Sequence, residues 1–170
     1  MSVNIALFGI PKSGKKKVIQ NCKEISLKNK YTFTVEHYCF PEKFGNRKFS
    51  PKKHSVESPH ITDEEINDRF YSVVFKEKML KNYDLVIYLD IDPSIIQEKF
   101  NSYNGHTTLA PPAFDEIRSW QMFEINQLEN ICRNHNLPLY YVYNIQQSEE
   151  EIEVILDNYL KTNKKAIQNM

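Results

Sequence analysis

The feature that most restricts the fold of this chain is the loop that follows its first apolar run. Residues 3–8 are mostly apolar, as in a short buried strand, and residues 15–28 carry Val18, Cys22 and Ile25 at helical spacing. The residues that join these two segments, 9–15, read GIPKSGK. A strand that enters a glycine-containing loop and leaves it as a helix predicts a β–loop–α unit at the start of the chain.

The loop matches the phosphate-binding pattern G-x-x-x-x-G-K-S/T at every position except the last, where Lys16 stands. Glycines in such a loop let the backbone N–H groups point inward at phosphate oxygens, and the helix start and the Lys15 ammonium add positive charge. The sequence therefore predicts that this loop cradles the phosphates of a nucleotide. The residues expected to hold them are Gly9, Pro11, Lys12, Ser13, Gly14, Lys15, Lys16 and Lys17.

Lys16 replaces the hydroxyl that normally ligates Mg²⁺ in this pattern, and an ammonium group cannot take over that role. Two interpretations stay open. In the first, the metal is held mostly through water and the phosphates, as in the adenylate-kinase version of the loop, which GIPKSGKK resembles. In the second, the loop binds phosphate but handles the metal poorly.

The rest of the chain alternates between predicted strands and predicted helices. Further apolar runs of strand length occupy residues 31–40, 85–89 and 137–142. Helical spacing or a helix start occurs at residues 62–80, 92–93, 114–135 and 148–159, and the last of these opens with a capping box, Ser148 with Glu151. Alternation of this kind is typical of a parallel sheet covered by helices.

We therefore expect an α/β protein with a three-layer P-loop fold, in which helices cover both faces of a parallel sheet of four or five strands. The whole chain, 1–170, is expected to form one domain. Residues 41–60 and 101–113 are expected to be loops, and the polar tail 161–170 is expected to fray.

Composition narrows the classes of function. Lysine and arginine total 22, as do aspartate and glutamate, so a broad charge-driven surface for nucleic acid or membrane is not expected. The three cysteines, Cys22, Cys39 and Cys132, lack ligand spacing and are interpreted as reduced thiols. With no signal-peptide pattern and no apolar run of membrane-spanning length, we expect a cytoplasmic protein.

With the loop placed, the chain resembles the thymidylate kinase family of P-loop nucleoside and nucleotide kinases. Residues 40–43, FPEK, are similar to the family's F-P-E/D-R segment, and residues 67–69, NDR, are similar to its helical A-D-R element. Residues 83–93, YDLVIYLDIDP, resemble its strand D-L-x-I-Y/F-L-D-x-D-P. The resemblance covers most of the chain, although short motifs carry it.

The resemblance implies ATP as phosphoryl donor, Mg²⁺ as cofactor and a small nucleoside or nucleotide as acceptor, with a homodimer left open. It implies that Arg69 contacts the acceptor, that Glu36 accepts a proton from it, and that Phe40 lies beside it. Phosphoryl transfer needs positioning, a metal and positive charge. We expect Lys15 to supply positive charge and Asp90, at a strand end, to hold the metal through water. The family usually carries arginines on a lid that neutralise the transferred phosphoryl group; residues 101–113 contain none, and we expect Arg118 to take their place.

Three functions compete. The leading one is ATP-dependent phosphoryl transfer to a nucleoside monophosphate or nucleoside. The second is a catalytically weakened homologue that acts by nucleotide binding or protein contact; Pro11, Lys16 and the lack of the strand with a D-R motif that related kinases carry favour it. The third, a small GTPase, lacks support because the guanine motif N-K-x-D is missing. We expect transfer slower than the usual kinase range of roughly 1–100 s⁻¹.

Residues 70–83 bear on the choice between an active kinase and a weakened homologue. Related kinases place a strand with a D-R motif between their first two strands, whereas residues 70–83 here have helical spacing. If that strand is missing, residues 31–40 must pair directly with residues 3–8, because an unpaired inner edge would leave buried backbone groups unsatisfied.

Overall fold

The computed structural model describes residues 2–10, 12–28, 32–39, 43–44, 47–48, 52–55, 77, 80–102 and 112–168. Its strands are β1 (Ser2–Phe8), β2 (Thr32–Cys39), β3 (Lys43–Phe44), β4 (Arg47–Lys48), β5 (Lys52–Ser55), β6 (Leu85–Leu89) and β7 (Leu139–Val142). Its helices are α1 (Lys15–Lys28), α4 (Pro93–Ser102), α5 (Phe114–Asn134) and α6 (Ser148–Gln168), with a short 3₁₀ helix η1 (Ile145–Gln147).

The main sheet has the strand order β5-β2-β1-β6-β7. β1 pairs in parallel with β2 on one side and with β6 on the other, and β6 pairs in parallel with β7. β5 is antiparallel to β2, so it differs from the all-parallel expectation. The α/β class, a parallel sheet with helices, is confirmed. β6 is buried along its whole length, which explains its unbroken apolar run.

The direct pairing of β1 and β2 confirms the prediction for residues 31–40. Phe8 at the end of β1 is in register with Tyr38 of β2 and with Tyr88 of β6. No strand separates β1 from β2 in this part of the sheet, since the two are register partners over the whole of β1. Of the positions described in residues 70–83, Glu77 and Leu80 are helical, whereas residues 81–83 are not.

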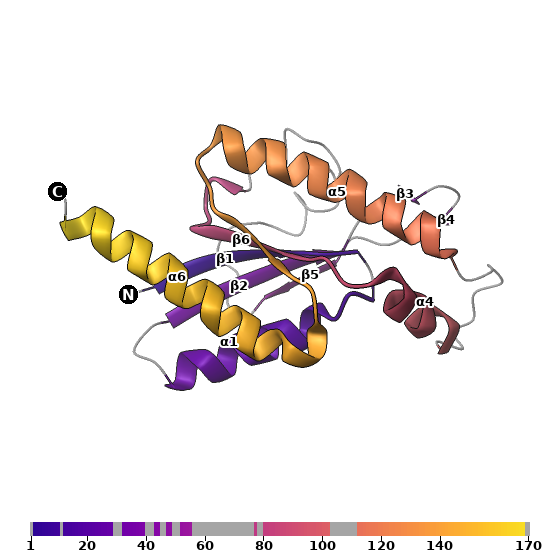
Figure 1. Cartoon of the computed structure of the whole chain (residues 1–170), viewed down its shortest axis with the longest axis horizontal. Coiled ribbons are helices and arrows are strands. Elements are labelled where there is room, and N and C mark those ends of the chain that lie inside the picture. Colours follow the sequence, from indigo (N-terminus) through magenta and orange to yellow (C-terminus); the bar gives the residue numbers. More distant parts are fainter. Residues whose placement is uncertain are drawn as a thin grey trace.

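Helices lie on both sides of the sheet. Figure 1 shows α5 along one side and α1 with α6 along the other. α1 packs against α6, and α4 packs against α5. Cys22 of α1 and Cys132 of α5 are free, buried cysteines, and burial raises the pKa of the Cys22 thiol to about 12 and that of Cys132 to about 11. Both remain protonated thiols at neutral pH.

Some segments differ from their expected form. β3, β4 and β5 lie within residues 41–60, which were expected to be a loop. α6 continues through Gln168, well into the tail, because that stretch contains no glycine or proline to end it. In the part of the chain that the structure describes, no helix has both the length and the apolarity needed to cross a membrane.

The amino ends of β1 and β6 are fastened by a reciprocal pair of hydrogen bonds. The backbone N–H of Asn4 donates to Asp84 Oδ2 (2.7 Å), and the N–H of Asp84 donates to the Asn4 carbonyl (2.8 Å). We expect Asp84→Ala to lower the free energy of unfolding by about 1–3 kcal/mol, because the Asn4 N–H loses its acceptor. Urea denaturation measures it. Asp84→Asn keeps an oxygen acceptor and should lose less; equal losses would contradict this account.

Candidate phosphate-binding site

The loop between β1 and α1 is compact and depends on its two glycines. Gly14 has φ +92°, a backbone conformation that side chains with a Cβ rarely adopt, and a Cβ there would lie 3.0 Å from Ile145 Cδ1. A Cβ on Gly9 would lie 3.2 Å from the Cβ atoms of Leu89 and Ser13. Lys12 also has a positive φ, 70°. Such strained backbone collects at functional loops.

Lys15 is the first residue of α1, and its side chain reaches back across the loop. Its ammonium donates to the carbonyl of Gly9 (2.5 Å) and to the carbonyl of Ile10 (2.9 Å). Only 5% of Lys15 is exposed. Ser13 tightens the same turn, because its hydroxyl donates to the Ile10 carbonyl (2.7 Å) and its backbone N–H also donates there. The lysine therefore puts a buried positive charge inside the loop.

The start of α1 concentrates positive charge. Lys15, Lys16 and Lys17 form its first turn, which contains no acidic residue. Lys16 and Lys17 are exposed. The amino end of a helix already carries partial positive charge, so each cation there is unfavourable by about 0.3–1 kcal/mol at the surface. An anion bound at the loop would offset that repulsion.

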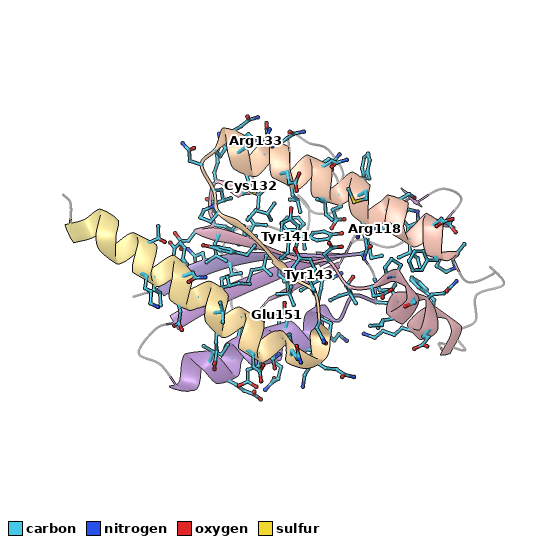
Figure 2. The ribbon with its side chains drawn as sticks, viewed as in Figure 1. Arg118, Cys132, Arg133, Tyr141, Tyr143 and Glu151 are labelled. Carbon is cyan, nitrogen blue, oxygen red and sulfur yellow. The ribbon has the colours of Figure 1, made fainter. Side chains whose placement is uncertain are left out.

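A second cluster lies at the carboxyl end of β6, the strand next to β1. Asp90 Oδ1 accepts a hydrogen bond from Arg118 of α5 at 2.6 Å. The same Arg118 nitrogen donates to Gln121 Oε1 (3.0 Å), and Gln121 Nε2 donates to the Ile91 carbonyl (2.7 Å). The Arg118 side chain is 40% exposed and that of Asp90 15%. Figure 2 shows Arg118 extending from α5 toward the sheet.

Polar groups continue inward from this cluster, between β6 and α5. Tyr88 lies on β6, two residues before Asp90, and Glu124 follows Gln121 by about one helical turn; both Tyr88 and Glu124 are buried. Within the described part of the chain, the Tyr88 hydroxyl has no hydrogen-bond partner. Burial raises the pKa of Tyr88, the negative charges of Glu124 and Asp90 raise it further, and Arg118 lowers it. The phenol is therefore neutral at physiological pH.

The C-terminal part of the chain supports the loop from the side. The Glu151 carboxylate accepts hydrogen bonds from the backbone N–H groups of Tyr143 (2.9 Å) and Asn144 (3.1 Å), which fixes the corner after β7 (Figure 2). That corner presents Ile145 to Gly14. Ser148, at the start of α6, accepts a hydrogen bond from Asn21 of α1 at 2.5 Å. Ser148 and Glu151 were expected to form a capping box; the structure shows Glu151 bonded to the corner after β7 and Ser148 bonded to Asn21 of α1.

The structure brings together part of the predicted site. Asp90 and Arg118 are in direct contact, whereas the contacts given above for Lys15 are to its own loop. Glu36 is the register partner of Ala6 on β1. Pro11, Phe40 and Arg69 lie outside the described residues.

Two residues of the site were not predicted, and no local motif marks either of them. The only signal for Gln121 is its spacing of three from Arg118 on one helix face. Ile145 has no signal, because its contact with Gly14 depends on how the β7 corner folds.

Among the described residues, no three cysteine, histidine, aspartate or glutamate side chains gather as a metal site. Asp90 is the carboxylate assigned to a metal-bound water, and it already accepts a hydrogen bond from Arg118.

Comparisons with protein-family models and with curated proteins give no match. The assignment of function therefore depends on the chemistry of the loop and of the Asp90 cluster.

Gln121 is buried and links α5 to the end of β6. Its replacement tests whether this link contributes to the stability of the protein. We expect Gln121→Leu to lower the free energy of unfolding by about 1–3 kcal/mol, because it leaves the Ile91 carbonyl without its donor. Urea denaturation measures the change. Ser119→Ala is the matched control, since Ser119 is exposed on the same helix and its hydroxyl donates to the Glu116 carbonyl within that helix. A loss for Gln121→Leu no greater than for Ser119→Ala would contradict the link.

Proposed function

We propose that the protein is an ATP-dependent phosphotransferase that acts on a nucleoside monophosphate or nucleoside, as the resemblance to thymidylate kinases suggests. The observation that supports it best is the buried Lys15 ammonium, held across a glycine-containing loop at the start of a helix. A buried cation beside backbone N–H groups favours a polyanion. The loop also lies at the carboxyl edge of the parallel strands, where α/β sheets bind their ligands.

In this proposal, residues 9–17 hold the triphosphate. Backbone N–H groups at the start of α1 and the ammonium groups of Lys15, Lys16 and Lys17 balance its charge. ATP would supply the phosphoryl group, and Mg²⁺ would bridge its phosphates. Because Lys16 has no hydroxyl to ligate a metal, the protein's contribution to the metal is a water-mediated contact from Asp90.

In the same proposal, Arg118 binds the phosphoryl group while it is being transferred. Its guanidinium is partly exposed and lies at the carboxyl end of β6, the strand next to the one that enters the loop. Asp90 and Gln121 orient it through the hydrogen bonds described above. Arg69, Glu36 and Phe40 remain the proposed contacts of the acceptor. With Asp90 shared between Arg118 and the metal, we expect slow transfer, below the usual kinase range of roughly 1–100 s⁻¹.

A second candidate is a nucleotide-binding protein in which transfer is lost. The 2.6 Å contact of Arg118 with Asp90 favours it, because each group partly neutralises the other. Both candidates require nucleotide at the loop, and turnover distinguishes them.

Lys15→Ala tests the phosphate site that both candidates share. We expect ATP affinity, measured by calorimetry, to fall about 10- to 100-fold, since a charge-assisted hydrogen bond contributes roughly 1.5–3 kcal/mol. Lys23→Ala is the matched control, because Lys23 is an exposed lysine farther along the same helix. Urea denaturation of each variant shows whether it is folded. If the folded Lys15→Ala variant bound ATP as tightly as the wild type, the phosphate site at the loop would be excluded, and both proposed functions with it.

Asp90→Asn tests transfer. A scan of nucleosides and nucleoside monophosphates with ATP and Mg²⁺, coupled to ADP release, identifies the acceptor. We expect Asp90→Asn to remove most of that turnover while ATP affinity changes less than twofold, because Asp90 lies outside the phosphate loop. Unchanged turnover in the variant would exclude Asp90 from catalysis. A wild-type rate of tens per second would instead indicate an ordinary kinase.

A further inference from the structure

β7 forms one lateral edge of the main sheet. Among the described strands, the order β5-β2-β1-β6-β7 gives β7 a neighbour on one side alone, and that neighbour is β6. In Figure 1 the orange segment that joins α5 to α6 contains β7; it lies nearest the viewer, and no described helix is drawn in front of it. An edge strand offers backbone N–H and C=O groups to another strand unless charges, proline or a covering element protect it.

The hydrogen bonds to β6 show which backbone groups of β7 face outward. N–H groups of β6 and of the residue after it donate to the carbonyls of Pro138 and Val142, both at 2.9 Å. Backbone groups alternate in direction along a strand, so Leu139 and Tyr141 direct their N–H and C=O groups away from β6. Within the part of the chain that the structure describes, neither of these two N–H groups has a hydrogen-bond acceptor.

Both ends of this open stretch are closed by bonds within the chain. The Leu137 N–H donates to the Cys132 carbonyl (2.9 Å), and the Tyr143 N–H donates to the Glu151 carboxylate (2.9 Å). The strand between them reads LYYV and carries no charge that would repel another strand. Tyrosine is a residue type enriched at protein interfaces, and Tyr143, just after the strand, is 59% exposed.

The open stretch is complementary to itself. When two copies of β7 lie antiparallel about a two-fold axis that passes between their Tyr140 residues, Leu139 of each copy is opposite Tyr141 of the other. Both residues face outward, so each such pair exchanges two N–H···O=C hydrogen bonds, and every open group gains a partner. Tyr140 then lies opposite its own copy in a non-hydrogen-bonded pair, where side chains approach most closely.

Side chains of α5 beside this edge are complementary as well. Glu129 accepts a hydrogen bond from the Tyr141 hydroxyl (2.6 Å), so it lies level with Tyr141. Arg133 follows Glu129 by one helical turn, at the end of α5 that leads into β7, and it is therefore level with Leu139 (Figure 2). Both charged side chains are exposed. The antiparallel pairing brings Arg133 of each copy to Glu129 of the other.

We propose that β7 is a docking surface for a second copy of this chain, and that an antiparallel β7–β7 pair joins the two five-stranded sheets into one. This inference does not depend on the proposed function, because no residue of the phosphate loop takes part in the contact. A pair this short buries less than the roughly 1,200–2,000 Å² of a standard interface, so we expect a weak dimer that forms as the protein concentration rises.

Amide hydrogen exchange of the full chain, followed by NMR at several protein concentrations, tests the pairing. Between roughly 10 and 500 µM protein, we expect exchange at the N–H groups of Leu139 and Tyr141 to slow about three- to tenfold, because they gain acceptors only in the dimer. Tyr140 and Val142 face β6 in both states, so their exchange should not change. Sedimentation velocity over the same range should show a monomer–dimer equilibrium.

Two results of this experiment would overturn the proposal. One is exchange at Leu139 and Tyr141 that does not depend on protein concentration. The other is a dimer that forms without protecting these two N–H groups, because the contact would then lie on another surface of the molecule.

Cysteine variants test the register. Under a mild oxidant, Tyr140→Cys should form an intermolecular disulfide, because a residue beside the two-fold axis meets its own copy at a separation that a disulfide can bridge. Tyr143→Cys is the matched control: Tyr143 is exposed, but in this register its copy is roughly 20 Å away, so this variant should cross-link no more than the wild type. Urea denaturation shows whether each variant is folded. Equal cross-linking of the two folded variants would overturn the register.

A charge reversal tests the contact between the helices. Arg133→Glu places a second carboxylate opposite Glu129 of the other copy, and since the contact occurs twice in the dimer, we expect the dissociation constant to rise about three- to tenfold. Lys161→Glu is the matched control, because Lys161 is an exposed cation on α6. An Arg133→Glu variant that dimerises as tightly as the Lys161→Glu control would overturn the antiparallel arrangement.

Discussion

The direct pairing of β1 with both β2 and β6 is the constraint on which the rest of the structure depends. A strand hydrogen-bonded in parallel on both sides has all its backbone groups satisfied and must be apolar on both faces. Parallel strands also end at the same edge. The loop after β1 and Asp90 after β6 therefore lie at the same edge of the sheet, although they are far apart in sequence.

The loop itself is held from two directions. From within, the Lys15 ammonium donates to the carbonyls of Gly9 and Ile10, so the charge that would attract phosphate also ties the two ends of the loop together. From outside, Ile145 lies so close to Gly14 that a Cβ added there would be 3.0 Å from Ile145 Cδ1, which is tighter than ordinary van der Waals contact. Because both supports come from the protein's own residues, they restrict the backbone conformation of the loop, and less conformational entropy is lost when an anion binds.

Short-range patterns predicted most of the fold. The β–loop–α unit, the buried run of β6 and the helix at Ser148 each depend on residues adjacent in sequence, and such signals are local. β5 was not predicted, because Lys52–Ser55 has no apolar alternation and is a strand only through pairing with β2. Gln121 and Ile145 were also missed. Their contacts depend on which helix crosses the end of β6 and on the corner after β7, and neither is encoded locally.

The contact between Ile145 and Gly14 has a consequence for synthesis on the ribosome. The proposed phosphate loop lies near the start of the chain, yet one wall of it comes from the corner after the last strand. The side chain of Asn21 also donates a hydrogen bond to Ser148 across 127 positions of sequence. When only β1 and α1 of a nascent chain have left the ribosome, the loop sequence is present, but the residues that pack against the loop are not. The edge strand β7 and the first turns of α6 must emerge before the loop acquires its final shape. Chains truncated ahead of β7 would thus contain every lysine of the loop and still lack its wall.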